Sequence, residues 1–310
     1  MGFLLAIINT FIETVKGYFS KKVSVSTDTL GDVCLINFFR SLFSVVIAML
    51  LMLIIGGSLP YWFSDARMTP VVLFSSFMLG VGYCTYFLAL RESAFMMTTM
   101  FTYLSIFIPI VLGALFMNET VHWIQWVGLA VMVVSFYFVS FFSKQVTGKV
   151  TFRGILFAVL TAISYGSQQF CMTLFHHYEP QMESANYSFF QFALSVGYLF
   201  IFAMIFRAVQ KKKGNPSSLT LAKIAKTSLI PVVAMATCSC INNYMTVTIS
   251  GLLPPVIAFP LMKGCSLVFS ILMSWLMLKE RPNRNCIIGA VICFIALLII
   301  NFGPRLLSAL

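Results

Sequence analysis

Apolar residues run along this chain in long segments, and a short polar stretch separates each segment from the next. A helix needs about 20 mostly apolar residues to cross the hydrocarbon core of a bilayer, because each residue adds about 1.5 Å of rise. We expect a membrane-spanning helix in each of ten segments: 2–19, 33–55, 70–90, 96–117, 123–143, 154–175, 184–206, 228–249, 253–278 and 285–302. The pattern therefore predicts an all-α membrane protein with ten transmembrane helices.

Composition agrees with this fold class. Hydrophobic residues make up 60% of the 310 positions and charged residues only 9%, whereas a soluble domain has roughly 25% charged residues. The longest connection, at about 207–227, is too short for a soluble catalytic domain. Because Gly2 starts an apolar run without a basic stretch before it or a small-residue cleavage site after it, we expect a retained span rather than a signal peptide.

The basic residues explain the net charge of +11 without a nucleic-acid partner, because they lie between the apolar segments and form no continuous patch. Of the 20 Lys and Arg residues, 15 fall in five alternate connections, and only Arg67 and Arg305 fall on the opposite side. Cytoplasmic loops carry the excess of Lys and Arg. We therefore expect these five connections in the cytoplasm and both termini outside, in a cell (plasma or inner) membrane.

Two short patterns occur once in each half of the chain. Residues 37–40 (Asn-Phe-Phe-Arg) return as residues 188–191 (Ser-Phe-Phe-Gln), an offset of 151, and each is followed by Ser-Val four residues later. Glu119 precedes Gly128 by nine residues, and Glu280 precedes Gly289 by the same nine, at an offset of 161. Repeats of this kind predict a duplicated architecture. We place the two units at 1–148 and 149–310.

Each unit holds five predicted helices. Because five is odd, the second unit must enter the membrane in the opposite sense from the first. Two five-helix inverted repeats are the architecture that lets a central site open alternately to either side, as in secondary transporters. An enzyme or a scaffold has no particular need for this arrangement.

The motif residues resemble the EamA-type module of the drug/metabolite transporter superfamily. The resemblance rests on residues 86–91 (Tyr-Phe-Leu-Ala-Leu-Arg), Pro109, Asn118-Glu119 and Gly128, and the second half repeats part of it in residues 278–280 (Leu-Lys-Glu) and Gly289. It implies a ten-span transporter over essentially the whole chain.

Two further features bear on that resemblance. The first span, with Glu13 near its middle and a lysine shortly after, is similar to the first helix of the small multidrug resistance proteins, and Arg40 falls where the EamA-type module often carries an Arg. The second half departs from the pattern, since Ser270 takes the place of Pro109 and no Arg matches Arg40. Functional symmetry between the halves is therefore not expected.

Four charged residues fall within predicted spans, where a charge costs a few kcal/mol and usually faces a cavity or a partner. Lys263 lies about ten residues into its span, too deep to snorkel, and Pro254, Pro255, Pro260 and Gly264 predict an irregular helix around it. Lys263 therefore contacts substrate or, alternatively, pairs with a buried carbonyl or with Glu13.

The other three in-span charges leave alternatives open. Glu13 and Lys16 are spaced three residues apart and can neutralise each other on one helix face. Either Glu13, as a buried carboxylate, carries a proton, or the two form an inert ion pair in which Lys16 reaches the near interface. Arg40 either binds a substrate carboxylate or phosphate through two hydrogen bonds or snorkels to the headgroup zone.

Uncharged polar residues within spans, Gln169 beside Gln168 among them, complete the predicted site, although each is alternatively a structural contact between helices. The candidate substrate-binding residues are Lys263, Glu13, Arg40, Tyr83, Tyr86, Gln168, Gln191, Asn242 and Asn243. We expect no catalytic residues, metal ligands or cofactor. The expected partners are a small-molecule substrate and membrane lipid, with the chain a monomer or homodimer.

These observations predict a transporter that moves a small organic metabolite by alternating access. Three in-span cations against one carboxylate favour an anionic or zwitterionic substrate, such as an amino acid or organic acid. One alternative is a proton-coupled exporter of drugs or aromatic compounds. An alternative of another class is a multispan lipid-modifying enzyme, which would need a cluster of catalytic residues at one interface that the sequence does not contain.

Overall fold

The computed structural model describes residues 2–55, 59–93, 95–117, 121–141, 151–212, 228–277 and 284–309, and every element within these ranges is a helix. In chain order they are α1 (Gly2–Ser24), α2 (Leu30–Ile55), α3 (Met68–Glu92), α4 (Phe95–Thr102), the 3₁₀ helix η1 (Tyr103–Ile106), α5 (Phe107–Phe116), α6 (Trp123–Phe141), α7 (Phe152–Tyr178), α8 (Ser184–Lys212), α10 (Leu229–Leu252), α11 (Pro255–Leu276) and α12 (Arg284–Ala309).

Each of the ten predicted segments is helical over most of its described residues. Seven helices are long and apolar enough to cross a membrane: α2, α3, α7, α8, α10, residues 255–273 of α11 and residues 287–304 of α12. The segments 103–116 and 123–135 are apolar but shorter. The polar residues Asn9, Glu13 and Lys16 lower the hydropathy of α1, which is otherwise long enough.

The irregular helix lies elsewhere than the sequence predicted. α11 is one continuous helix through Pro260 and Lys263. Pro254 and Pro255 occupy its cap and first position, where a missing N–H costs nothing, so only Pro260 interrupts its hydrogen bonding. The break falls instead in the fourth segment, where η1 separates α4 from α5. Pro109 lies just after η1, and its ring conflicts with the carbonyl four residues earlier.

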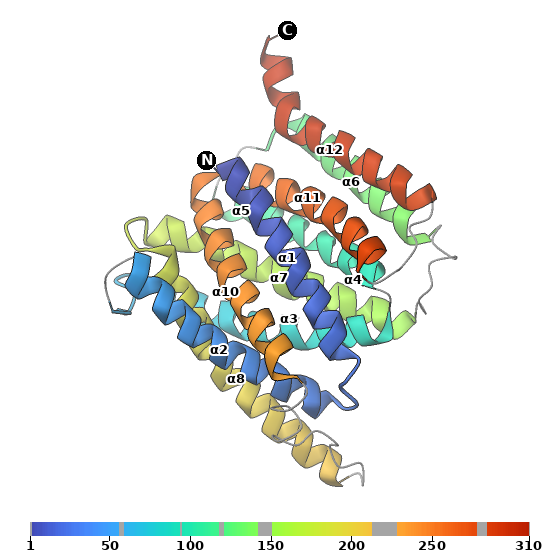
Figure 1. The fold of residues 1–310 in the computed structure, drawn as a ribbon. Helices are drawn as coiled ribbons and strands as arrows, with labels where there is room; N and C mark the ends of the chain where they lie inside the picture. The colour runs from blue at the N-terminus through green and yellow to red at the C-terminus, as the bar shows by residue number, and fades with distance from the viewer. Residues whose placement is uncertain are drawn as a thin grey trace.

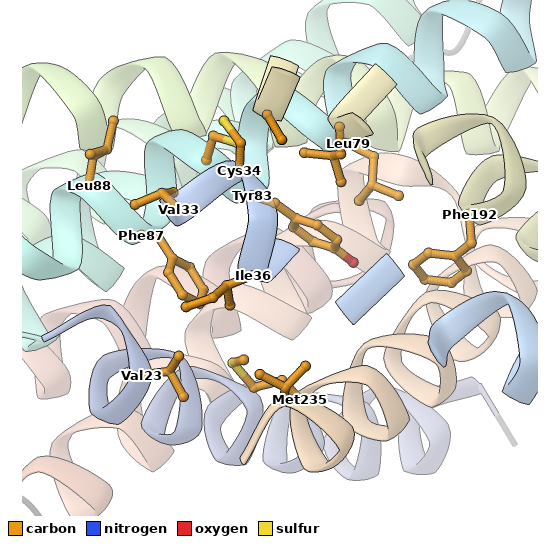
Figure 2. Packing of buried hydrophobic residues seen from close by; sticks show 14 of the residues in the cluster. Val23, Val33, Cys34, Ile36, Leu79, Tyr83, Phe87, Leu88, Phe192 and Met235 are labelled. Carbon is orange, nitrogen blue, oxygen red and sulfur yellow. The ribbon is translucent and has the colours of Figure 1, made fainter. Parts of the chain in front are cut away.

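Most helices of one half pack against helices of the other half. At one edge of the molecule α6 lies along α12, and α2 lies along α8 on the opposite side (Figure 1). Between these pairs, α1 contacts α10 and α11, and α3 contacts α7. The apolar core around α2, α3, α8 and α10 includes Val33, Leu79, Phe192 and Met235, with the Tyr83 ring among them (Figure 2).

The glycines of the repeated motif lie at the interface of α6 and α12. A Cβ at Gly128 would lie 2.5 Å from Ile300 and 3.2 Å from the Ala296 carbonyl oxygen. On the other helix, the Gly289 carbonyl oxygen accepts a 2.7 Å hydrogen bond from Ser135. Small residues allow such close approach between helices in membranes. The motif residues Asn118, Glu119 and 278–280 lie outside the described residues.

Polar contacts tie the helices together at both ends of the bundle. At one end, Lys21 Nζ donates to the Ser93 carbonyl (2.8 Å) and Arg207 approaches Asp32 (3.8 Å). At the other end, Ser64 donates to Glu179 and Asn186 donates to the Tyr61 carbonyl. The basic residues Lys21 and Arg207 therefore lie at one end, as their predicted connections require.

Candidate functional site

A polar stripe runs along α1. Asn9, Glu13, Lys16 and Ser20 follow one another at spacings of four, three and four residues, which places them on one face of the helix. Asn9, Lys16 and Ser20 are buried, and their side chains bond or contact residues of α10. α1 therefore presents its polar face to the interior of the bundle and its apolar face outward.

Glu13 pairs with Lys263 across the interface of α1 and α11. Lys263 Nζ lies 2.8 Å from Glu13 Oε1, and the lysine side chain is only 4% exposed. The ion-pair partner of Glu13 is therefore Lys263 on α11, and not Lys16 on the same helix, as the alternative of a Glu13–Lys16 pair required. A pair with Glu13 was one of the two alternatives for Lys263, and the structure contains it.

Lys16 is the first donor in a series of hydrogen bonds that joins α1 to α10. Its ammonium group donates to Asn242 Oδ1 (3.2 Å), and Asn242 Nδ2 donates to Asn9 Oδ1 (2.8 Å). Asn9 in turn donates to the Thr246 hydroxyl (3.0 Å). Lys16 is buried and does not reach the interface as a bystander would. Within the described ranges, no carboxylate oxygen lies within 4.0 Å of its Nζ.

Two cavities meet at these residues. The first has a volume of about 40 Å³, and its apolar lining is Leu79, Met172 and Met262. Its polar and charged lining consists of Glu13, Lys16, Tyr83, Tyr165, Gln168, Gln169, Ser239, Asn242, Asn243, Thr246 and Lys263. The second, of about 20 Å³, includes Tyr86, Phe95 and Tyr103 in its lining. Glu13, Lys16 and Tyr165 line both, so these three residues form the partition between them.

Arg40 takes neither of its predicted roles directly. Its side chain is fully buried, so it does not snorkel. Nε and Nη2 donate to the Ser239 hydroxyl at 2.9 and 2.6 Å, and the guanidinium carbon lies 3.7 Å from the centre of the Tyr83 ring. Ser239 and Tyr83 line the first cavity, whereas Arg40 does not. Stacking and hydrogen bonds therefore hold Arg40 one layer behind the cavity wall.

Gln191 also lies behind the wall. It donates to the Ser75 hydroxyl and accepts from Asn243 Nδ2 (2.7 Å), while Tyr187 donates to the same Ser75 (2.7 Å) and Ser188 donates to Asn243 (2.9 Å). This network links α3, α8 and α10. Of its members only Asn243 lines the cavity.

The predicted site residues thus fall into two groups. Lys263, Glu13, Tyr83, Gln168, Asn242 and Asn243 line the first cavity, and Tyr86 lines the second. Arg40 and Gln191 support the wall from behind.

Several cavity residues were absent from the prediction. The stripe spacing on α1 would have identified Lys16 as a cavity residue, since polar residues at helical spacing in an apolar segment share one face. Gln169, which the sequence offered beside Gln168, also lines the first cavity. Nothing in the pattern distinguishes Tyr165 or Ser239 from other small polar or aromatic residues within spans.

Three residues that line the first cavity each have a buried polar atom without a hydrogen-bond partner among the described residues. The atoms are Glu13 Oε2, Gln169 Oε1 and the Tyr165 hydroxyl. Buried polar groups are normally paired. Their concentration around one cavity marks it as a place for a polar occupant.

Comparison with known proteins places the chain in a family. The model of the EamA-like transporter family matches residues 1–141 and again residues 152–302. No curated protein matches the chain. Among solved structures 28 chains match. One of them, titled "Crystal structure of protein", has a TM-score of 0.65 at 12% sequence identity and covers 99% of this chain and 98% of that one; this likeness concerns the fold.

The family match and the seven long apolar helices together identify an integral multi-pass membrane protein with a transporter-like function. Because the matched residues span nearly the whole length, this chain belongs to the EamA-like transporter family.

Proposed function

We propose that this chain is a secondary transporter that moves a small anionic or zwitterionic organic metabolite, such as an amino acid or organic acid, by alternating access. The observation that carries this proposal is the central cavity among α1, α3, α7, α10 and α11, which two lysines and one glutamate face. Charges buried in the membrane interior mark substrate and ion pathways.

The charge balance of the cavity favours an occupant with a negative group. Glu13 is engaged by Lys263 at 2.8 Å. Lys16 has no carboxylate within 4.0 Å in the described part of the chain, and the guanidinium of Arg40 lies just behind Tyr83 and Ser239. Positive charge in a low-dielectric site attracts anions more strongly than in water, so the cavity suits a carboxylate better than an isolated cation.

The packing of the helices supports ten spans arranged as two five-helix inverted repeats, 1–148 and 149–310. We pair α1 with α7, α2 with α8, α3 with α10, α4–α5 with α11, and α6 with α12. If each helix is replaced by its counterpart in the other half, the α1–α10 contact becomes the α7–α3 contact, and the structure contains both. In the same way the α3–α8 contact becomes the α10–α2 contact, and both of these also occur. The α2–α8 and α6–α12 contacts are unchanged by the exchange, because each joins a helix to its own counterpart. Superposition of the halves in an experimental structure should pair α2 with α8, and any other pairing would refute the repeat.

We further propose that the end of the bundle with Lys21, Arg91 and Arg207 faces the cytoplasm of a cell membrane and that both termini face outward. Leu310 lies outside the described residues. A reporter active only in the cytoplasm and fused to Leu310 should therefore give no signal, whereas the same reporter inserted at 213–227 should give a strong one. A strong signal from the Leu310 fusion would reverse the orientation.

The direct test of the function is a thermal-shift screen of the purified chain against a metabolite library, followed by transport of each hit in proteoliposomes. We expect anionic or zwitterionic solutes among the hits and counterflow of the same solutes across the bilayer. A set of hits that bind but never cross the bilayer would contradict transport. Hits restricted to hydrophobic cations would favour a drug exporter instead.

A further inference from the structure

Resting on the proposed function, we infer that Lys16, rather than Lys263, binds the substrate carboxylate, and that Glu13 and Gln169 receive its ammonium group. One cavity then contains both a binding group for a carboxylate and a binding group for an ammonium ion, so it selects a zwitterion such as an α-amino acid. This assignment reverses the roles that the sequence indicated for the two lysines.

Lys263 is committed to a partner within the protein. Its ammonium group lies 2.8 Å from Glu13 Oε1 and 5.9 Å from the centre of the Tyr103 ring, and its side chain is 4% exposed. A substrate carboxylate at Lys263 would have to displace or share this ion pair. Displacing it would leave a buried carboxylate without its cation, which is costly.

Lys16 has unused capacity for an anion. An ammonium group has three N–H donors, and in the described structure Lys16 uses one of them, in a 3.2 Å bond to Asn242 Oδ1. Its side chain is 9% exposed and lines both cavities. A carboxylate in the first cavity would supply the missing acceptors through charge-assisted hydrogen bonds.

The binding group for the ammonium ion consists of acceptors that lack donors. Glu13 and Gln169 line the first cavity, and in the described part of the chain their buried atoms Glu13 Oε2 and Gln169 Oε1 have no hydrogen-bond partner. An ammonium group supplies several donors at once, and it is attracted by the carboxylate of Glu13. The Tyr165 hydroxyl, which is also without a partner, is able to donate to the carboxylate or to accept from the ammonium group.

Compounds with only one of the two groups fit less well. An amine without a carboxylate would add a second cation beside Lys16 and leave its donors unmet. A carboxylate without an amine would leave the buried acceptors of Glu13 and Gln169 unpaired, which is unfavourable. Leu79, Met172 and Met262 supply an apolar part of the wall for a side chain.

The test uses the full-length wild-type chain in detergent and three chemical series: the 20 standard amino acids, their N-acetyl derivatives and their carboxamides. Affinity is measured by isothermal titration calorimetry after a thermal-shift ranking. For at least one free amino acid we expect saturable binding, and blocking either the amine or the carboxylate should weaken it roughly 10- to 100-fold. This comparison needs no variant and is independent of any folding defect.

A variant assigns the carboxylate to Lys16. In Lys16→Met the preference for the free acid over its amide should fall below about threefold, while the preference for the free amine over its N-acetyl form should persist. Lys22→Met is the matched control, because Lys22 is exposed on the same helix and its replacement should change neither preference.

The outcomes separate this inference from the proposed function. If amino acids do not bind while other organic anions bind and are transported, the zwitterion assignment is wrong and the transporter stands. If amino acids bind but Lys16→Met keeps the full preference for the free acid, Lys16 is not the carboxylate ligand. If no metabolite of any class binds or crosses the bilayer, the proposed function itself fails.

Discussion

Two polar networks lie side by side in the interior of this protein, and they differ in whether their hydrogen bonds are complete. In the first, Gln191, Asn243, Ser75, Tyr187 and Ser188 bond to one another across α3, α8 and α10. In the second, around Glu13 and Lys16, three polar atoms lack partners. A complete network stabilises helix contacts, whereas an incomplete one around a cavity indicates that a ligand completes it.

The largest expected effect comes from the ion pair in the incomplete network. Lys263→Ala should lower the free energy of unfolding by up to about 3 kcal/mol, because it leaves the Glu13 carboxylate, whose side chain is 19% exposed, without its cation. Thermal melts and denaturant titration in detergent measure this. The double variant Lys263→Ala/Glu13→Gln should recover much of the loss. A fully stable Lys263→Ala protein that no longer binds substrate would instead make Lys263 the ligand.

Replacement of Gln191 tests the complete network. Gln191→Leu removes the bonds to Ser75 and Asn243 and should lower the free energy of unfolding by about 1–2 kcal/mol. Substrate affinity, measured by calorimetry, should change little, because Gln191 does not line the cavity. A large loss of affinity with unchanged stability would place Gln191 in the binding site.

Two tyrosines give a matched comparison of the networks. The Tyr187 hydroxyl donates to Ser75, so Tyr187→Phe should cost about 0.6 kcal/mol of stability and leave affinity unchanged. The Tyr165 hydroxyl has no partner, so Tyr165→Phe should leave stability unchanged and weaken substrate binding. Thermal melts measure the stability of both variants, and calorimetry measures their substrate affinity. If the two variants changed stability and affinity equally, the two networks would not differ in function.

The smallest expected effect lies outside the membrane, at an exposed ion pair that serves as a reference. The hydrogen bonds from Arg67 hold the pKa of Asp65 below its ordinary value of 3.8. A carboxyl with a lowered pKa contributes stability above its unfolded pKa, and this stability is lost as pH falls through the folded pKa. Arg67→Ala should return the Asp65 pKa toward 3.8 and lower the melting temperature only slightly above pH 4, and this difference from the wild type should disappear at lower pH as Asp65 becomes protonated. A large difference that persists below pH 4 would show that Arg67 stabilises the loop by something other than this ion pair.

The sequence alone located the helices and the most costly charges. Apolar segment length predicted where the helices lie, because backbone groups in lipid must be satisfied within the helix, but it did not predict the break of the fourth segment into α4, η1 and α5. Glu13 and Lys263 stood out because an ionised group in an apolar segment needs a cavity or a partner. The repeated glycines, Gly128 and Gly289, were visible as a pattern, and the structure places both at the interface of α6 and α12.

Only the tertiary structure decided which charges meet. Glu13 had two lysines within reach by sequence, and the packing of α1 against α11 brings Lys263 to 2.8 Å. The predicted snorkelling of Arg40 was wrong because α10 brings Ser239 and α3 brings Tyr83 to its guanidinium. Tyr165 became a site residue for the same reason. Side-chain partners in different helices depend on rotation and register about each helix axis, which the apolar pattern constrains only to a face.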